Sequence, residues 1–66
     1  METDTRIKMD IAAFMAVSGK SMAELGALLG MSRGTIYARY RNPGTFSLNE
    51  YRELYRIIGK WIRLAS

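Results

Sequence analysis

Apolar residues recur along the first part of the chain at the spacing of an α-helix. Four of them stand at i, i+4, i+7 and i+8 and so share one helical face: Ile7, Ile11, Phe14 and Met15. This pattern predicts a first helix over residues 5–17, capped at its start by Thr3 or Asp4. Gly19 is expected to end it, because glycine readily adopts the left-handed conformation that follows many helices.

A second, shorter helix is predicted after it. Ser21 and Glu24 have the spacing of a capping box, in which each side chain accepts a hydrogen bond from the backbone N–H of the other residue. The segment then carries an apolar stripe: Met22, Leu25, Leu28 and Leu29. Gly30 is expected to end this helix after about eight residues.

A third helix and a tight turn are predicted next. Ser32 is placed to cap a helix that reaches Tyr40 or Arg41. Residues 42–45, Asn-Pro-Gly-Thr, then have proline and glycine at the positions typical of a type II turn.

The last third of the chain begins with a second capping box, Ser47 and Glu50. It starts a fourth helix in which five residues are expected to face the core: Tyr51, Leu54, Tyr55, Ile57 and Ile58. Gly59 is expected to end or kink this helix. Residues 60–66 then form either a short helix on the core or a strand that pairs with a second copy. The sequence therefore predicts one all-α domain over residues 1–66, a small bundle of four to five helices.

Composition narrows the possible functions. The 66-residue chain has neither cysteine nor histidine, which removes disulfides, thiolate metal ligands and the commonest general base. Since no carboxylates converge either, we expect no enzyme, no metal and no cofactor. No apolar run approaches a membrane span and the N-terminus is not a signal peptide, so the cytoplasm is the expected location. Methionines at apolar helical positions are expected to fill the core: Met9, Met15, Met22 and Met31.

Charge is distributed unevenly along the chain, whose net charge is +4. No acidic residue lies between Glu24 and Glu50, a stretch that holds Arg33, Arg39 and Arg41. Such asymmetry favours a polyanionic partner, although a solvated basic surface has the same composition. Charge alone leaves the two interpretations evenly balanced.

The second and third predicted helices meet the physical requirements of a helix-turn-helix. A small residue, Gly26, stands where the two helices would cross. Gly30 supplies the positive φ that the turn requires, and Met31 follows it to fill the corner. Ile36 is the apolar anchor of the second helix of the pair.

The segment that holds these residues resembles a known family. The segment MAELGALLGMSRGTIYARYRN, and LGMSRGTI within it, is similar to the helix-turn-helix of phage repressors and Cro-type proteins. The resemblance covers about residues 21–59 and implies a lambda repressor-like bundle. It departs from the family at three positions: Met22 replaces a glutamine that contacts phosphate, Gly26 replaces an alanine, and Arg39 replaces a second apolar anchor. Tyr40 lies about 40° from Ile36 on the helical wheel and is available for that anchoring role.

The resemblance implies double-stranded DNA as the partner, with the third helix in the major groove. The outward positions of that helix and its tip are the candidates for base contacts: Arg33, Gly34, Tyr37 and Ala38. Gly34 has an equally simple interpretation as a first-turn glycine. Candidates for contacts to the DNA backbone are Lys20, Ser21, Ser32, Thr35, Arg39, Arg41 and Asn42. For Arg39, a surface acid is an alternative partner to phosphate.

A homodimer is expected, because one module of this size buries little surface on DNA. The candidate subunit contact is the apolar tail, with Trp61, Ile62 and Leu64. Trp61 has an alternative role in the core, and the dimer is expected to be weak without DNA. The sequence therefore predicts a transcriptional regulator of a bacterial or phage-infected cell. The alternative is a protein-interaction module with the same fold, such as an antirepressor or an antitoxin-like protein.

Overall fold

The computed structural model describes the backbone of residues 2–65 and the side chains of residues 3–63. No strand occurs among these residues, and the chain forms a small all-α bundle, as predicted. Its elements in order are α1 (Glu2–Ser18), α2 (Met22–Leu28), α3 (Arg33–Arg41), the 3-10 helix η1 (Pro43–Thr45) and α4 (Leu48–Ala65).

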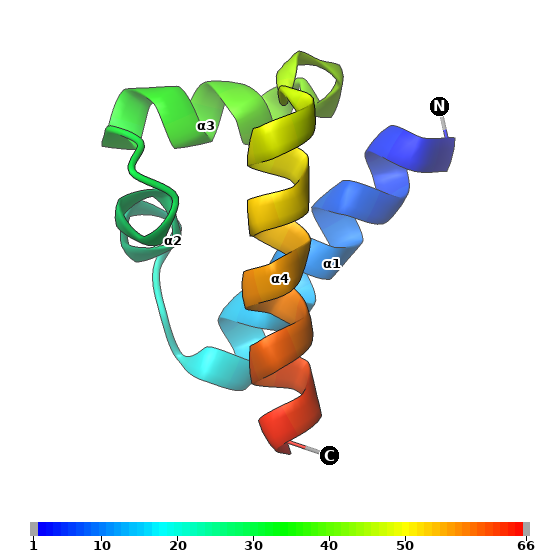
Figure 1. The fold of residues 1–66 in the computed structure, drawn as a ribbon, viewed down its shortest axis with the longest axis vertical. Coiled ribbons are helices and arrows are strands. Elements are labelled where there is room, and N and C mark those ends of the chain that lie inside the picture. The colour runs from blue at the N-terminus through cyan, green and yellow to red at the C-terminus, as the bar shows by residue number, and fades with distance from the viewer. Residues whose placement is uncertain (1, 66) are drawn as a thin grey trace.

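The helices are arranged as two packed pairs. In Figure 1, α4 stands in front of α1 and crosses it, while α2 and α3 lie together to one side. η1 joins the end of α3 to the start of α4 and contacts both α1 and α3. The Cα trace measures 29 × 26 × 19 Å along its principal axes. α3 therefore lies at the edge of the molecule, with one side against the bundle and the other toward solvent.

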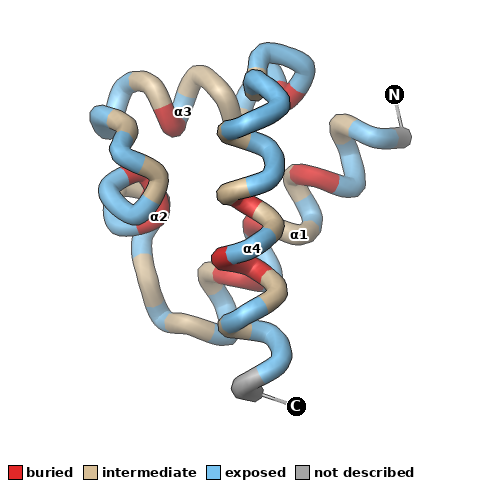
Figure 2. The backbone as a smooth tube through the Cα atoms, in the orientation of Figure 1, coloured by how far each residue is buried: buried red, intermediate tan, exposed pale blue. Residues whose placement is uncertain are grey.

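All four α-helices contribute to one core. Figure 2 shows that the buried stretches face the interior between the helices. The buried apolar residues are Ile7, Ile11, Phe14, Met22, Leu25, Ile36, Leu54, Ile57 and Ile58. No described polar or charged residue is buried. Each fully buried side chain of this size contributes about 1.5–3 kcal/mol to the stability of the fold. The fold therefore depends on this single cluster.

Two glycines turn the chain between helices, as predicted. Gly19 has φ +72° and follows the end of α1, where its N–H donates to the Met15 carbonyl at 3.0 Å. Gly30 has φ +71° and lies in the turn between α2 and α3. Residues with a Cβ are strained in this region, so both turns depend on glycine.

The start of α1 and the turn after α3 differ from the predictions. α1 already begins at Glu2, so Thr3 and Asp4 lie within the helix and do not cap it. Residues 43–45 form η1 rather than a type II turn, since Gly44 does not have a positive φ. The Thr45 N–H donates to the Asn42 carbonyl at 2.9 Å, a bond that a type II turn and a 3-10 helix share. The next bond, from the Phe46 N–H to the Pro43 carbonyl at 3.1 Å, continues the pattern as a 3-10 helix.

α4 continues through Gly59 to Ala65, so the predicted break at Gly59 is wrong and the tail is helical. The physical reason is tertiary packing on both sides of the glycine. Ile57 and Ile58 are buried before it, and Trp61 packs against the core after it. The ring of Trp61 meets Phe14 edge-on, with centroids 6.4 Å apart and an interplanar angle of 83°.

Three apolar side chains expected to face the core are exposed. Met9 is 63% exposed, because it is about 200° around the helix from each of its neighbours Ile7 and Ile11. Leu28 is 47% exposed, since the short α2 presents only one narrow face to the core. Tyr51 is also exposed and stacks on Tyr55, with ring centroids 4.9 Å apart.

Within the described part of the chain, no single helix has the length and apolarity needed to cross a membrane. α1 and α2 have the necessary length and apolarity only when they are taken together, and the chain bends by 99° between them.

Candidate nucleic-acid interface

α2 and α3 are held together by the close approach predicted at Gly26. A Cβ atom at this glycine would lie 2.8 Å from Cγ2 and 3.0 Å from Cβ of the buried Ile36. The Gly26 carbonyl also accepts from the Met31 N–H at 2.7 Å, which secures the turn between the helices. Ile36 is thus pressed onto the backbone of α2, and the outer side of α3 faces away from the bundle.

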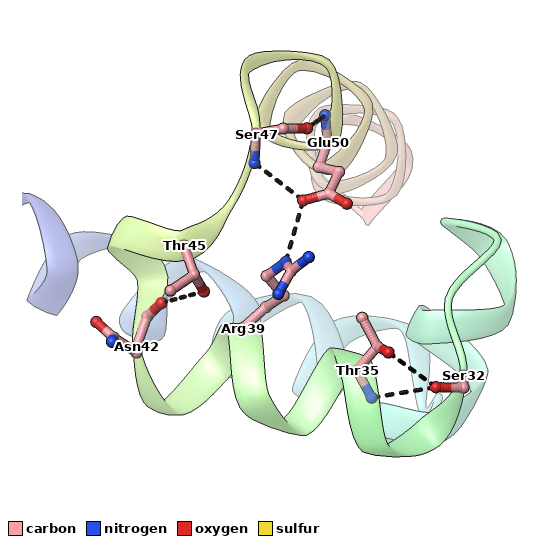
Figure 3. A network of polar contacts seen from close by, with 7 residues as sticks. All are labelled: Ser32, Thr35, Arg39, Asn42, Thr45, Ser47 and Glu50. Carbon is pink, nitrogen blue, oxygen red and sulfur yellow. Dashed lines mark hydrogen bonds and ion pairs between the residues drawn. The ribbon is translucent and has the colours of Figure 1, made fainter.

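The start of α3 is capped by Ser32, as predicted. Its hydroxyl oxygen accepts from the Thr35 N–H at 3.2 Å, and the same hydroxyl donates to Thr35 Oγ1 at 2.9 Å (Figure 3). α2 and α4 carry a capping glutamate three residues after their serine caps, whereas α3 has Thr35 there. The first turn of α3 therefore contains no acid, and it carries Arg33.

The predicted base-contacting residues lie on one side of α3. On a helical wheel, Arg33, Gly34, Tyr37 and Ala38 fall within an arc of about 140°, which also holds Arg41, one of the predicted backbone contacts. All of them are exposed except Ala38, which is half-buried. A Cβ added at Gly34 would meet nothing within 4 Å. This side of the helix is therefore open to a large partner.

Arg33 and Tyr37 are one helical turn apart and contact each other. The guanidinium carbon of Arg33 lies 5.8 Å from the centroid of the Tyr37 ring. At exposed sites such a cation–π contact contributes about 0.5–1 kcal/mol. The ring thus favours one direction for the arginine while leaving its donors free to reach a partner.

The end of α3 carries the two predicted backbone-binding residues Arg41 and Asn42, which are both exposed. Arg41 has no ion-pair partner among the described residues. Asn42 ends the helix, and its N–H donates to the Ala38 carbonyl at 3.1 Å.

Arg39 does not lie with this set. Its Nε donates to Glu50 Oε1 at 3.1 Å, and both side chains are less than a third exposed (Figure 3). Of the two partners expected from the sequence, phosphate or a surface acid, the structure shows the acid. The pKa of Glu50 lies below its usual value, first because of the Ser47 N–H and then because of Arg39.

The predicted backbone contacts at Lys20 and Ser21 stay predictions, and the structure shows both residues in contacts within their own chain. The Lys20 ammonium lies 5.3 Å from the centroid of the Trp61 ring. The N–H of Ser21 donates to Glu24 Oε1 at 2.9 Å, and its hydroxyl accepts from the Glu24 N–H at 3.1 Å. The carboxylate of Glu24 thus occupies the position at the start of α2 where a phosphate would have to bind.

The three residues of the predicted subunit contact differ in their surroundings. Trp61 is half-buried and contacts Phe14 and Lys20 of its own chain, which is the core role considered from the sequence. Ile62 is 37% exposed. The side chain of Leu64 lies outside the described residues. A dimer contact at the tail stays a prediction.

The partner of Arg39 was missed by the sequence reasoning. Glu50 was identified only as a capping residue of α4, although it is the sole acid between Glu24 and Glu53. A single acid within a basic stretch is the signal from which a specific cationic partner could have been predicted.

A groove of about 670 Å³ lies elsewhere, between α1 and α4. It is lined by Thr3, Thr5, Arg6, Ile7, Met9, Tyr51 and Tyr55, and no residue of α3 takes part. The Tyr55 hydroxyl beside it donates to Asp10 Oδ2 at 2.6 Å, which ties α4 to α1. No group of three or more His, Cys, Asp or Glu side chains in the described chain is placed to hold a metal ion.

The outer side of α3 is the surface that gathers the four predicted base contacts together with Arg41. Comparison with known proteins adds no relative: no family model, curated protein or solved structure matches this chain.

Proposed function

We propose that this chain is a sequence-specific DNA-binding transcriptional regulator that reads the major groove of double-stranded DNA with α3. The observation that carries the proposal is the open, acid-free outer side of α3, fixed by the contact of Ile36 with Gly26. A helix about 10–12 Å in diameter fits the major groove, which is about 12 Å wide.

In this proposal the tip of α3 makes the most specific contact. Arg33 donates two hydrogen bonds to O6 and N7 of a guanine, the commonest specific contact between a side chain and a base. Tyr37 holds its guanidinium on one side. Gly34 presents no side chain, so the backbone approaches the bases closely, and Ala38 contacts a thymine methyl group.

Contacts to phosphate fix the helix in the groove. Arg41 and Asn42 bind the DNA backbone at the end of α3. At its start the Thr35 hydroxyl donates to a phosphate, while the Ser32 hydroxyl donates to Thr35 and holds it in place. Arg41 is exposed and has no ion-pair partner among the described residues. These contacts add affinity without adding sequence preference.

We further propose that two copies bind a pseudo-palindromic site. Recognition helices of such dimers lie about 34 Å apart, one turn of DNA. This spacing is close to the 29 Å length of the molecule, so two adjacent copies fit one face of the duplex. Occupying the site blocks polymerase, in the cytoplasm of a bacterial or phage-infected cell.

A selection of bound sequences from a random DNA library tests the proposal. The expected result is a palindromic consensus with guanine at one fixed position of each half-site. Binding should weaken steeply between about 50 and 200 mM salt, because phosphate contacts release counterions. A library that shows no enrichment, or an affinity that salt does not change, would contradict DNA reading.

One observation favours a protein-interaction module instead. The Glu24 carboxylate lies at the start of α2, and Leu28 at its end is 47% exposed. A negative and apolar α2 suits a protein partner better than a phosphate backbone. Failure to bind any DNA at low salt would favour this second function.

A further inference from the structure

Arg39 occupies a side of α3 that faces the bundle. On the helical wheel it lies about 60° to one side of Ile36, while Tyr40 lies about 40° to the other. Ile36 is fully buried and Tyr40 packs against the core. Arg39 completes this inward set with a charged group, which requires a partner inside the fold.

That partner is itself fixed in place. Glu50 Oε1 accepts from the Ser47 N–H at 2.9 Å as well as from Arg39, and the Glu50 N–H donates to the Ser47 hydroxyl at 3.1 Å. The carboxylate is therefore part of the cap of α4 and cannot follow α3 if that helix moves. Figure 3 shows the chain of contacts from Ser47 through Glu50 to Arg39.

α3 is consequently tied to the bundle at two different heights. Near its start, Ile36 rests on Gly26 of α2. Near its end, Arg39 is bonded to the first turn of α4. The contact at Ile36 acts as a pivot. Beyond it, the packing of Tyr40 on the core limits the tilt of the helix, and the bond from Arg39 to Glu50 adds a directional restraint. A tilt of about 10° moves Arg41 by about 1 Å, since five residues of helix span about 7.5 Å. Displacements of this size impair a binding geometry.

We propose that Arg39 is a positioning residue: through Glu50 it sets the tilt at which α3 enters the DNA groove, and it does not itself bind phosphate. This inference rests on the proposed function. It predicts that Arg39 affects which sequences are preferred rather than how strongly DNA is held in general.

Arg39→Met and the control Arg41→Met remove the same charge from positions two residues apart. For Arg39→Met, affinity for the selected site should fall about tenfold, while affinity for random DNA and the dependence of affinity on salt stay unchanged. For Arg41→Met, affinity should fall on both DNAs, and the slope of log K against log salt should become shallower by about one unit. An equal loss of slope in both variants would show that Arg39 is a phosphate contact and overturn the proposal.

Glu50→Gln examines the same pair from the other side. Glutamine keeps the capping box of α4 but removes the charge that Arg39 faces. We expect a smaller loss of preference than in Arg39→Met, because the glutamine oxygen still accepts from the Arg39 Nε–H without the charge. The double variant should lose no more than Arg39→Met alone, because the two residues act as one unit. If Glu50→Gln makes the slope of log K against log salt steeper by about one unit, Arg39 has gained a phosphate contact and the proposal fails.

A measurement without DNA separates the pair from the function. In the free protein, the Arg39 Nε–H should exchange with solvent more slowly than that of Arg41, and Glu50→Gln should reduce the difference, because a neutral acceptor holds the N–H less strongly. Equal exchange in the wild-type chain would contradict the pair itself. A chain that binds no DNA contradicts the proposed function and with it the inference. A chain that binds DNA but fails the comparison of the two arginines contradicts the inference alone.

Discussion

Gly26 shows how one missing side chain sets the position of a helix. An alanine there would place its Cβ 2.8 Å from Cγ2 of Ile36, which is fully buried in the core. The sequence alone was sufficient to identify Gly26 as the crossing position. It did not reveal how tight the crossing is, because that depends on the side chain that faces it.

Gly26→Ala should therefore destabilise the fold, despite the better helix propensity of alanine. The gain in propensity is about 1 kcal/mol, and overpacking of a core costs about 1–3 kcal/mol. We expect a net loss of about 1 kcal/mol in the free energy of unfolding, measured by urea denaturation. Gly34→Ala is the matched control, since its Cβ meets open space. It should stabilise the protein by up to about 1 kcal/mol, and a stabilised Gly26→Ala would refute the tight crossing.

Arg33→Ala tests base reading at the tip of α3. Loss of a bidentate contact should weaken binding to the selected site by about 1–3 kcal/mol and relax the preference at one base position. Repeating the library selection with the variant measures both effects. An unchanged consensus would remove Arg33 from the reading role.

At the level of elements, the cues that predicted the helices were local ones. The caps Ser21, Ser32 and Ser47 and the end signal Gly19 act through neighbouring residues, and all four are confirmed. Local cues could not predict that the helix continues through Gly59. Its place within α4 depends on Trp61, whose ring packs on Phe14, a residue 47 positions earlier in the chain.

Gly59→Ala should accordingly stabilise α4. A Cβ there meets nothing within 4 Å and the backbone φ is not positive. Alanine in a helix interior is favoured over glycine by about 1 kcal/mol, so the urea midpoint should rise. Gly19→Ala supplies the contrast, because φ +72° strains a residue with a Cβ and the midpoint should fall. A lower midpoint for Gly59→Ala would indicate that α4 does not run straight through this position.

At the scale of the whole molecule, acidity should weaken the contact between the two helix pairs. The pKa of Glu50 is lowered from its usual 4.5, so its carboxylate stabilises the fold at any pH above about 4.5. That contribution is lost as the pH falls through the lowered pKa of the folded state. The pKa of Glu24, at the start of α2, is also lowered, first because its carboxylate accepts from the Ser21 N–H.

The free energy of unfolding should therefore be nearly level from pH 7 to about pH 5 and fall below that. Urea titrations followed by circular dichroism at pH 6 and pH 3 measure the difference. Glu50→Gln should be less stable at pH 6 and show a smaller drop between the two pH values. If the drop is as large as in the wild-type chain, titration of the Glu50 carboxylate, which accepts from Ser47 and from Arg39, does not contribute to it.

The position of Trp61 has a practical consequence. It is the chain's only tryptophan, and it lies against Phe14 and under the ammonium of Lys20, at the end of α4 that is remote from α3. Its fluorescence is therefore an intrinsic optical reporter of how α1 and α4 are packed. Binding at α3 alone should leave the emission unchanged, whereas a shift on adding DNA would place a second event at the opposite end of the molecule.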